Sequence, residues 1–461
     1  MNPLLNPLLF GRVLRWYLED PTKLRRMNNE ELRRFQNHAF KAMLTYAYTV
    51  PVYHEKYTAL GIHPHDIRGL QDIKKLPSIT KEELRRNFPT NVVPSTFQTK
   101  KAIVAATSGT TGRSLSLYTD LSTVIRSMLG FRRALLEHHI PWQKIRMSLL
   151  LDLSENSFEN EYFIHSILSI AKRILPTKHF QILDILCSPT DLIQQINQFE
   201  PEVILGYPFV LIRLAALKNR GYGEKIAPKW IGTSGAVCDT YSRRFIEEAF
   251  HTQLFDIYAA TESGIIAFEC KEGRYHVCSD LVFLECLTNG ADAPAGSPGL
   301  LTVTRLYGKG TPLIRYRGID DVVTVSHDDC SCGLPGDVLE AIHGRKSESI
   351  VLPDGRIALI SVFEHCIGES LYEIKVNKIK RIQIVQHRID AIEVRVLFDD
   401  YLRDAGCSAD ETLCLLHHKL QQRLGNQLEI QLKEVERFDD KAPYILSTID
   451  RAHVLEKSYL V

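Results

Sequence analysis

Hydroxyl groups and glycines are concentrated in residues 107–114, which read TSGTTGRS. Glycine lets the backbone approach a ligand closely and adopt positive φ, so the amides and hydroxyls of such a loop can surround a phosphate. The apolar run Ile103–Ala106 precedes the loop and the alternating run Leu115–Tyr118 follows it, which predicts a connection between two strands. The loop lacks the Gly-Lys-Ser/Thr ending of a Walker motif. A solvated Ser/Thr/Gly turn is the alternative interpretation.

Three later segments also place polar groups beside apolar runs. Thr261 and Glu262 follow the expected strand Leu254–Tyr258, residues 315–321 read RYRGIDD, and residues 344–348 read GRKSE. In this order and at these separations, the four segments resemble the core motifs of the acyl-adenylate-forming enzymes. The closer resemblance is to the phenylacetate–CoA ligase-like branch, with its capsule-biosynthesis-associated and deazaflavin-adenylating relatives.

The N-terminal part carries a second set of similar motifs. Residues 51–54 (PVYH) and 76–85 (LPSITKEELR) look like the N-terminal signature of that branch, and the likeness extends from about Pro51 to Asp450. The resemblance implies that a carboxylic acid and ATP form acyl-AMP and pyrophosphate. The acyl group then passes to CoA, to a carrier-protein thiol or to an amine. It also implies an α/β fold in which residues 1–344 form a large ATP- and carboxylate-binding domain and residues 345–461 a small, mobile α+β lid.

Forming an acyl-adenylate requires that the triphosphate be neutralised and the carboxylate be positioned for attack on the α-phosphorus. We expect Thr261 to hydrogen-bond the α-phosphate and Glu262 to hold Mg²⁺, which prefers a carboxylate together with phosphate oxygens. An acid near the start of a helix is the structural alternative for Glu262. The loop residues expected at the β- and γ-phosphates are Ser108, Gly109, Thr110, Thr111 and Gly112.

The resemblance assigns the remaining nucleotide contacts. Ser234, Gly235 and Ala236 resemble the loop that holds adenine, and Tyr258 precedes the Thr-Glu pair as it does in the family. Asp320 matches the acid that binds both ribose hydroxyls, and a carboxylate can accept two such bonds. Asp321 is the adjacent alternative for this role.

The same comparison identifies the groups of the lid. Arg345 resembles the arginine that opens the interdomain hinge and contacts ribose or phosphate. Lys441 is the candidate catalytic lysine, because a cation on a long stem can reach the carboxylate and the α-phosphate together. The alternative for Lys441 is a surface lysine.

Several positions depart from the family pattern. Asp440 replaces the glycine expected before Lys441, and Ala259 replaces the glycine expected after Tyr258. Gly318-Ile319 interrupts the polar spacing before Asp320, and Ser347 stands where the hinge has an aspartate.

A metal site is suggested by the spacing of three cysteines and one histidine. The set Cys270-x5-His276 and Cys330-x-Cys332 supplies three thiolates and an imidazole, which satisfy a closed tetrahedral Zn²⁺ site with a structural role. The positions also resemble a C…H…CxCG pattern in the branch. Buried thiols without a metal are the alternative.

Composition narrows the possible partners and the compartment. The 461 residues carry 56 basic and 55 acidic side chains, so the net charge of +1 gives no support for nucleic-acid binding. Pro3, Pro7, Arg12 and Arg15 interrupt the apolar N-terminus, so no membrane span is predicted. Ten cysteines without a regular disulfide spacing predict a reducing cytoplasm. The oligomeric state is left open.

Periodicity predicts the organisation of the chain. Helical spacing covers residues 28–46, and from about residue 100 to 340 short apolar strands alternate with helices such as Phe209–Lys218 and Thr240–Phe250. Beyond residue 344, strands surround a helix over residues 408–425 that begins with a Ser-x-x-Glu capping box.

Two other classes of protein compete with a ligase as the interpretation of this sequence. One is a non-catalytic nucleotide-binding relative that acts in assembly or regulation, and the other is an α/β hydrolase, for which the Gly-x-Ser-x-Gly elbow is absent.

Overall fold

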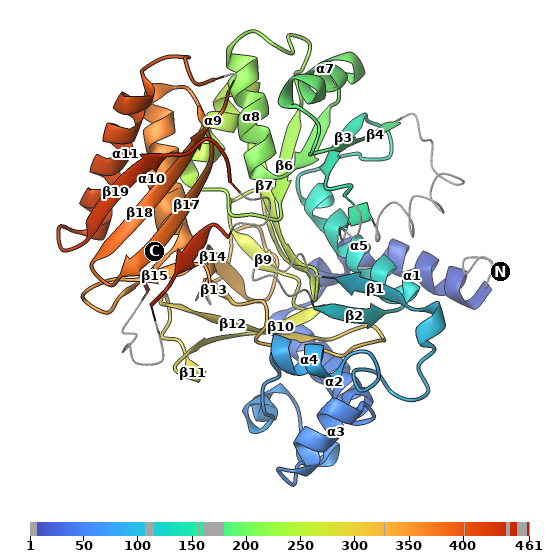
Figure 1. Ribbon diagram of the computed structural model, residues 1–461. Helices are drawn as coiled ribbons and strands as arrows, with labels where there is room; N and C mark the ends of the chain where they lie inside the picture. Colours follow the sequence, from blue (N-terminus) through green and yellow to red (C-terminus); the bar gives the residue numbers. More distant parts are fainter. Residues whose placement is uncertain are drawn as a thin grey trace.

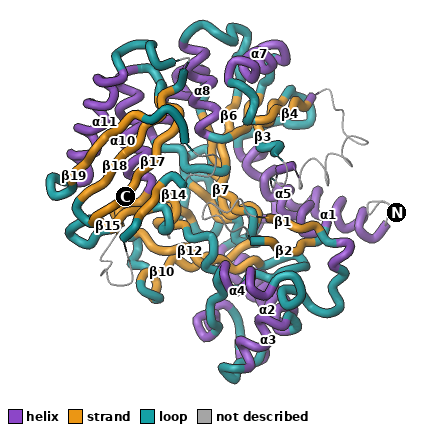
Figure 2. Tube along the Cα trace, viewed as in Figure 1, coloured by secondary structure: helices purple, strands orange, loops and turns teal. Residues whose placement is uncertain are grey.

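The computed structural model describes residues 7–106, 115–154, 157, 159–160, 179–326, 328–400, 402–438, 443–449 and 459–460. Figure 1 shows a large central sheet, a helical N-terminal part beside and below it, and a C-terminal unit of helices and a second sheet on the opposite side. Figure 2 shows strands running through the middle of the molecule and many of the helices at its periphery, while the strands β17, β18 and β19 face the viewer. No helix among the described residues is long and apolar enough to cross a membrane.

The N-terminal helices begin at clear capping signals. Asn28 and Glu31 form a capping box at the start of α2, and Thr80 and Glu83 form another at α4. The predicted helix over residues 28–46 is therefore confirmed. The helices of this part are α1 (Pro7–Lys23), α2 (Asn29–Tyr48), α3 (Pro51–Thr58), α4 (Lys81–Asn87) and α5 (Leu121–Glu137). Helix α5 packs against α1.

The central sheet has twelve strands and two halves of different character. Strands β4-β3-β5-β6-β7 run parallel, whereas the pairs from β7 through β11 are antiparallel. In spatial order the strands are β11 (Ala291–Asp292), β10 (Val282–Thr288), β12 (Pro298–Arg305), β13 (Asp321–Ser326), β14 (Val338–Arg345), β9 (Tyr275–Val277), β8 (Gly264–Glu269), β7 (Leu254–Ala260), β6 (Trp230–Ser234), β5 (Val203–Gly206), β3 (Met147–Leu151) and β4 (Phe180–Asp184).

The predicted alternation of strands and helices is confirmed in the parallel half. Helices α7 (Pro189–Phe199), α8 (Pro208–Asn219) and α9 (Thr240–Phe250) lie between successive parallel strands and share a buried core with them. The side chains of Ser188 and Asp239 cap α7 and α9.

A separate antiparallel pair flanks the hydroxyl-rich loop. Strands β1 (Ile103–Ala106) and β2 (Ser116–Thr119) pair directly, so the predicted strand–loop–strand arrangement is confirmed. Thr311, which follows β12, connects β2 to the main sheet by two hydrogen bonds with Tyr118. Its backbone N–H donates to the Tyr118 carbonyl (2.9 Å), and its hydroxyl accepts the Tyr118 N–H (3.1 Å). The loop itself, residues 107–114, lies outside the described residues.

The C-terminal unit has its own sheets and its own core. Apolar residues between Ile350 and Ile445 form a buried cluster that draws on no residue of the N-terminal part. The predicted α/β class with a smaller α+β unit is confirmed, while a boundary between residues 344 and 345 stays a prediction. The elements are β15 (Ser349–Val351), β16 (Ile357–Leu359), α10 (Ile360–Ile374), β17 (Ile379–Arg388), β18 (Ala391–Phe398), α11 (Ala409–Leu424), β19 (Glu429–Glu434), β20 (Ile445–Ser447) and β21 (Tyr459–Leu460).

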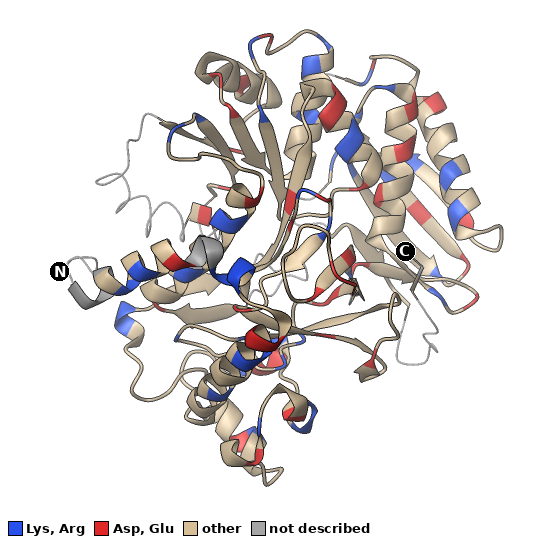
Figure 3. Ribbon diagram, turned by 180° about the vertical axis from the view of Figure 1, so that it is seen from behind, with Lys and Arg blue, Asp and Glu red and all other residues tan. Residues whose placement is uncertain are grey.

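Both charge signs are spread over the helices of the two parts, as Figure 3 shows from behind. This distribution agrees with the balanced composition, because neither sign gathers on one helix face in that view.

Candidate functional site

Two of the predicted nucleotide-binding segments lie at one edge of the parallel sheet. Ser234 ends β6, and Thr261-Glu262 follow the end of the adjacent parallel strand β7. The Ser234 hydroxyl donates to the Ile257 carbonyl at 2.7 Å, which joins the two strand ends. Ligands bind at the carboxyl ends of parallel strands in open α/β sheets, so this edge is the expected place for a nucleotide.

Gly235 meets two constraints that only glycine satisfies. Its φ is +84°, and a Cβ at this position would lie 2.5 Å from the ring of Tyr207, which follows β5. The backbone after β6 therefore lies directly against an aromatic ring, with no side chain between them. The adenine contact that the resemblance assigns to this loop stays a prediction.

Glu262 is a buried carboxylate without a cationic partner among the described residues. Its side chain is 7% exposed, and Oε1 accepts a hydrogen bond from the Tyr316 hydroxyl at 3.1 Å. Arg305 donates to the Glu262 backbone carbonyl (3.1 Å) and not to its carboxylate. A buried charge is normally paired or bound to a metal, so the environment of Glu262 fits a bound cation.

The adjacent acids Asp320 and Asp321 have different surroundings. Asp321 accepts a short hydrogen bond from the Tyr258 hydroxyl, and burial raises the pKa of Asp321 to about 6. Asp320 accepts the backbone N–H of Ser347 on Oδ2 at 2.7 Å, and its carbonyl accepts the N–H of Lys346 at 2.8 Å. Asp321 is thus engaged with Tyr258, while Asp320 contacts the segment expected to act as a hinge.

Arg345 completes this group of charges. It is the last residue of β14, it pairs across the sheet with Asp321, and its guanidinium lies 3.6 Å from Glu348. Electrostatic coupling joins Asp321 to both Arg345 and Glu262. The structure therefore brings together Tyr258, Glu262, Asp320 and Arg345, which lie far apart in the sequence.

Lys81 belongs to the same group, and the sequence analysis assigned it no role. Its half-buried ammonium forms no hydrogen bond or ion pair among the described residues, and burial lowers the pKa of Lys81. The charges that act on it include Glu262, Asp320 and Arg345. The sequence feature that could have drawn attention to Lys81 is its position directly after the N-cap residue Thr80. A capping box fixes the position of the first helical residue.

Two sets of predicted residues lie outside the described part of the chain. They are the loop residues Ser108, Gly109, Thr110, Thr111 and Gly112, and the lid residue Lys441. Pro443 and Tyr444, which follow Lys441, are described and hydrogen-bond to β17 through their carbonyls.

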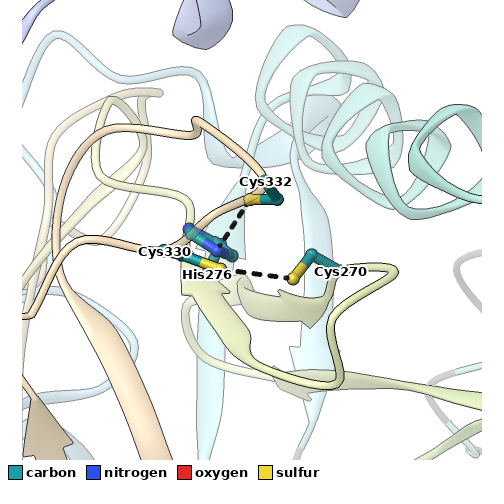
Figure 4. Close-up of side chains that lie close together, drawn as sticks. All are labelled: Cys270, His276, Cys330 and Cys332. Atoms are coloured by element: carbon teal, nitrogen blue, oxygen red, sulfur yellow. Dashed lines mark hydrogen bonds between the residues drawn. The ribbon is translucent and has the colours of Figure 1, made fainter.

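The three cysteines and the histidine converge, as Figure 4 shows. Their ligand atoms all lie within 4.8 Å of one another, with Cys270 Sγ 3.9 Å from Cys330 Sγ and Cys332 Sγ 3.1 Å from His276 Nε2. Cys270 follows β8, His276 lies in β9, and the other two occupy the loop after β13. Burial lowers the pKa of His276 to about 4, which keeps the imidazole neutral as a metal ligand requires.

Two buried atoms near this cluster lack partners among the described residues. They are His276 Nδ1, on the side of the ring away from the thiols, and Oε1 of Glu137 at the end of α5. Arg25 ties Glu137 to the cluster, since it pairs with the Glu137 carboxylate and donates to the Cys332 carbonyl at 3.0 Å. The Glu137 carboxylate also acts electrostatically on His276, and the described residues show no hydrogen bond between the two side chains.

No family model matches the sequence. Curated proteins match it along most of its length. The phenylacetate-coenzyme A ligase of Escherichia coli K12 is 25% identical over 426 residues, covering 87% of this chain and 90% of the relative. Protein CapK of Staphylococcus aureus is 24% identical over 324 residues, covering 68% and 67%. The resemblance to the phenylacetate–CoA ligase-like branch is confirmed.

Solved structures show that the fold is that of adenylate-forming ligases, the expected enzyme class. A 2-hydroxyisobutyryl-CoA ligase in its postadenylation state superposes with a TM-score of 0.71 at 18% identity, covering 92% of this chain and 90% of that one. The same ligase in its thioesterification state gives a TM-score of 0.58 at 20% identity over 91% and 90%.

The raised pKa of Asp321 predicts a pH-dependent stability. The carboxyl group has an ordinary value of 3.8 when unfolded and about 6 when folded, so the folded state binds more protons between these values. Its stabilising contribution is complete below pH 3.8 and is lost as the pH rises through 6. Relative to Asp321→Asn, the wild-type free energy of unfolding should fall by about 2–3 kcal/mol across this range.

Denaturant unfolding at several pH values between about 4 and 7 measures this difference. The exposed Asp404 provides the control, because Asp404→Asn should leave the wild-type curve unchanged. Parallel curves for wild type and Asp321→Asn would contradict the prediction.

Proposed function

We propose that the protein activates a carboxylic acid with ATP, releases pyrophosphate and transfers the acyl group to CoA. The observation that carries this proposal is the convergence of Glu262, Asp320 and Arg345 at the carboxyl edge of the parallel strands. The alternative of a non-catalytic relative has no observation in its favour, because these residues are all present and grouped.

Each described residue has a role in this proposal. Glu262 would hold Mg²⁺, which supplies positive charge to the phosphates when bound. Thr261 is the proposed partner of the α-phosphate, and Asp320 of the ribose hydroxyls. The Ser234-Gly235-Ala236 loop is the proposed adenine site, where the close approach of Tyr207 to Gly235 leaves a flat surface.

Lys81 is assigned to the α-phosphate as well. The phosphate chain would run from the ribose at Asp320 towards the metal at Glu262, and these two acids both act on the Lys81 ammonium. A cation between them would meet the charge that develops on the α-phosphate. Lys81 stands on the N-terminal part, whereas Lys441 is expected to approach from the C-terminal unit.

CoA is the proposed acceptor because several curated relatives are named phenylacetate-coenzyme A ligase. A carrier-protein thiol or an amine is the second possible acceptor, and the match to CapK supports retaining it.

We also propose that residues 1–344 and 345–461 act as body and lid. All ten cysteines are free, which suits a cytoplasmic protein.

Zn²⁺ is the proposed ion of the Cys270/His276/Cys330/Cys332 cluster. Tetrahedral zinc with Zn–S bonds of about 2.3 Å separates two sulfurs by about 3.8 Å, and the sulfurs of Cys270 and Cys330 are 3.9 Å apart. Four protein ligands leave no open position, so the ion would stabilise the fold without taking part in the reaction.

The first half-reaction tests the proposal directly. Glu262→Gln should abolish acid-dependent exchange of pyrophosphate into ATP, because the amide no longer provides a charge for Mg²⁺. Asp320→Ala should raise the KM for ATP while kcat changes less, because a ribose contact binds substrate and transition state alike. Exchange is measured with a panel of carboxylic acids, and wild-type kinetics in both variants would exclude the proposed site.

The metal assignment has an independent test. We expect one Zn²⁺ per chain by elemental analysis, and a lower melting temperature after chelation because binding at a closed site stabilises the folded state. Cys332→Ser should lose the metal, whereas Cys414→Ser, at an exposed cysteine outside the cluster, should retain it. A metal-free protein whose melting temperature is unaffected by chelators would refute the assignment.

The two lysines should differ between the half-reactions. Loss of a charge contact made mainly in the transition state costs about 3 kcal/mol, or about 10²-fold in rate. Lys441→Ala should slow acyl-AMP formation by about that factor and leave transfer from supplied acyl-AMP nearly intact. Lys81→Met should slow both steps, because its position does not depend on the lid. Single-turnover rates decide this, with the exposed Lys144→Met as control; a Lys81→Met protein that is normal in both steps would contradict the role.

A further inference from the structure

Helices α9 and α10 join the N-terminal part to the C-terminal unit, and Figure 1 shows α10 beside α9. Polar contacts lie at the rim of this interface. The Tyr372 hydroxyl donates to Glu248 Oε1 at 2.6 Å, and the Lys375 ammonium donates to Glu248 Oε2 at 3.3 Å. These contacts are exposed, so each contributes little to docking.

A carboxylate from the N-terminal part lies at the centre of the interface. Asp239 caps α9, and its Oδ1 accepts the backbone N–H groups of Tyr241 (2.9 Å) and Ser242 (3.1 Å). A Cβ on Gly368 of α10 would lie 2.3 Å from this same oxygen. Helix α10 therefore packs directly on the Asp239 carboxylate, and burial raises the pKa of Asp239.

A second carboxyl group faces it from α10. Glu364 lies one turn before Gly368, and residues four apart share a helix face. Its Oε2 is shielded from solvent and has no hydrogen-bond partner among the described residues. Burial, together with Asp239 and Glu348, raises the pKa of Glu364 well above its ordinary value. The ionised form of the carboxyl group is disfavoured in this position, because a charge shielded from water and left without a partner is costly.

The other titratable groups around Glu364 do not neutralise it. From the C-terminal unit, the Tyr444 phenol faces Glu364, Asp239 and Glu348, and His365 acts on Asp239. From the N-terminal part, Cys238 is influenced by both carboxyl groups. The nearby arginines are paired with other acids, Arg243 with Glu269 and Arg345 with Glu348.

We propose that Glu364 is protonated while α10 packs on the Asp239 side of α9, so that docking of the C-terminal unit on the N-terminal part takes up a proton. Separation would expose Glu364 to water and return it to its ordinary acidity, with release of the proton to solvent. Docking is then strongest below the ordinary carboxyl pKa of 4.5. It weakens by up to tenfold per pH unit until the raised pKa is passed, and is constant above it.

The two arrangements that this requires have a precedent in the fold. The 2-hydroxyisobutyryl-CoA ligase has been solved in a postadenylation and in a thioesterification state, and this chain superposes better on the first. Glu364 and Asp239 are positioning residues in this proposal. They set how firmly α10 rests on α9 and touch no substrate.

Energy transfer between dyes on the two exposed cysteines, Cys187 and Cys414, measures docking without substrate. Peptide mapping verifies that only these two positions are labelled. As the pH rises above the ordinary carboxyl pKa of 4.5, the wild-type signal should move towards the undocked value, with a docking constant that falls by up to tenfold per unit. Glu364→Gln should stay docked and lose this pH dependence, because a neutral amide needs no proton.

Asp239→Asn keeps a side chain that can cap α9 and should reduce the pH dependence in the same direction. Glu340→Gln, at an exposed position of β14, should follow the wild-type profile. A folded Glu364→Gln protein with the wild-type pH profile would overturn the proposal. Because no acid or nucleotide is added, this result is independent of whether the proposed reaction takes place.

Discussion

The segment Arg315–Arg317 connects three regions that are distant in sequence. Tyr316 exchanges backbone hydrogen bonds with Val303 of β12 at 2.9 Å in both directions. On the other side, Ile79 donates to the Arg315 carbonyl (3.1 Å) and accepts from the Arg317 N–H (3.0 Å). The N-terminal segment before α4 therefore joins the main sheet through this segment alone, among the backbone bridges of the described residues.

The side chains of the same segment fix the candidate site. Arg315 binds Glu285 with two hydrogen bonds of 3.0 and 2.9 Å and donates to the Leu76 carbonyl at 2.6 Å. The fully buried Tyr316 directs its hydroxyl at Glu262. Since Lys81 follows Ile79 by two residues, this segment determines the positions of both Glu262 and Lys81. Removal of either partner of the buried Arg315–Glu285 pair would leave an uncompensated charge beneath the site.

Two departures from the family pattern have structural explanations. A Cβ on Gly318 would lie 2.1 Å from the Tyr316 hydroxyl, so a polar side chain there would displace the group that binds Glu262. Ser347 contacts Asp320 through its backbone N–H, and this bond does not depend on the side chain. The serine in place of aspartate therefore leaves the link between Asp320 and the hinge segment intact.

Local signals allowed much of the fold to be predicted. Helical periodicity predicted the helix over residues 28–46, and β7 begins at Leu254, the first residue of the strand expected over Leu254–Tyr258. The helix after Ser408 also begins and ends as predicted. The antiparallel half of the large sheet has no comparable local signal. Strand β9 pairs with β14 across more than 60 residues, and local sequence patterns do not predict pairing over such distances.

The candidate site shows the same division between local and long-range information. Thr261, Glu262 and Asp320 were identified because they stand in recognisable motifs. Lys81, Glu137 and Glu364 were not, since a single charged residue on a helix usually faces solvent. Their significance comes from the groups that the fold places near them. These are a pair of acids for Lys81, the Arg25 guanidinium for Glu137 and another carboxyl group for Glu364.

Asp320 links the proposed chemistry to the arrangement of the two parts. Its Oδ2 and its carbonyl accept backbone N–H groups from Ser347 and Lys346, directly after the last residue of β14. A carboxylate has capacity for further hydrogen bonds, so the ribose contact proposed for Asp320 would add to these hinge contacts without replacing them. Rotation of the hinge segment would break the hinge contacts and change the environment of Asp320. In the proposed site, nucleotide binding would therefore be coupled to the orientation of the C-terminal unit through this one residue. Helices α9 and α10 supply a second contact between the same two parts.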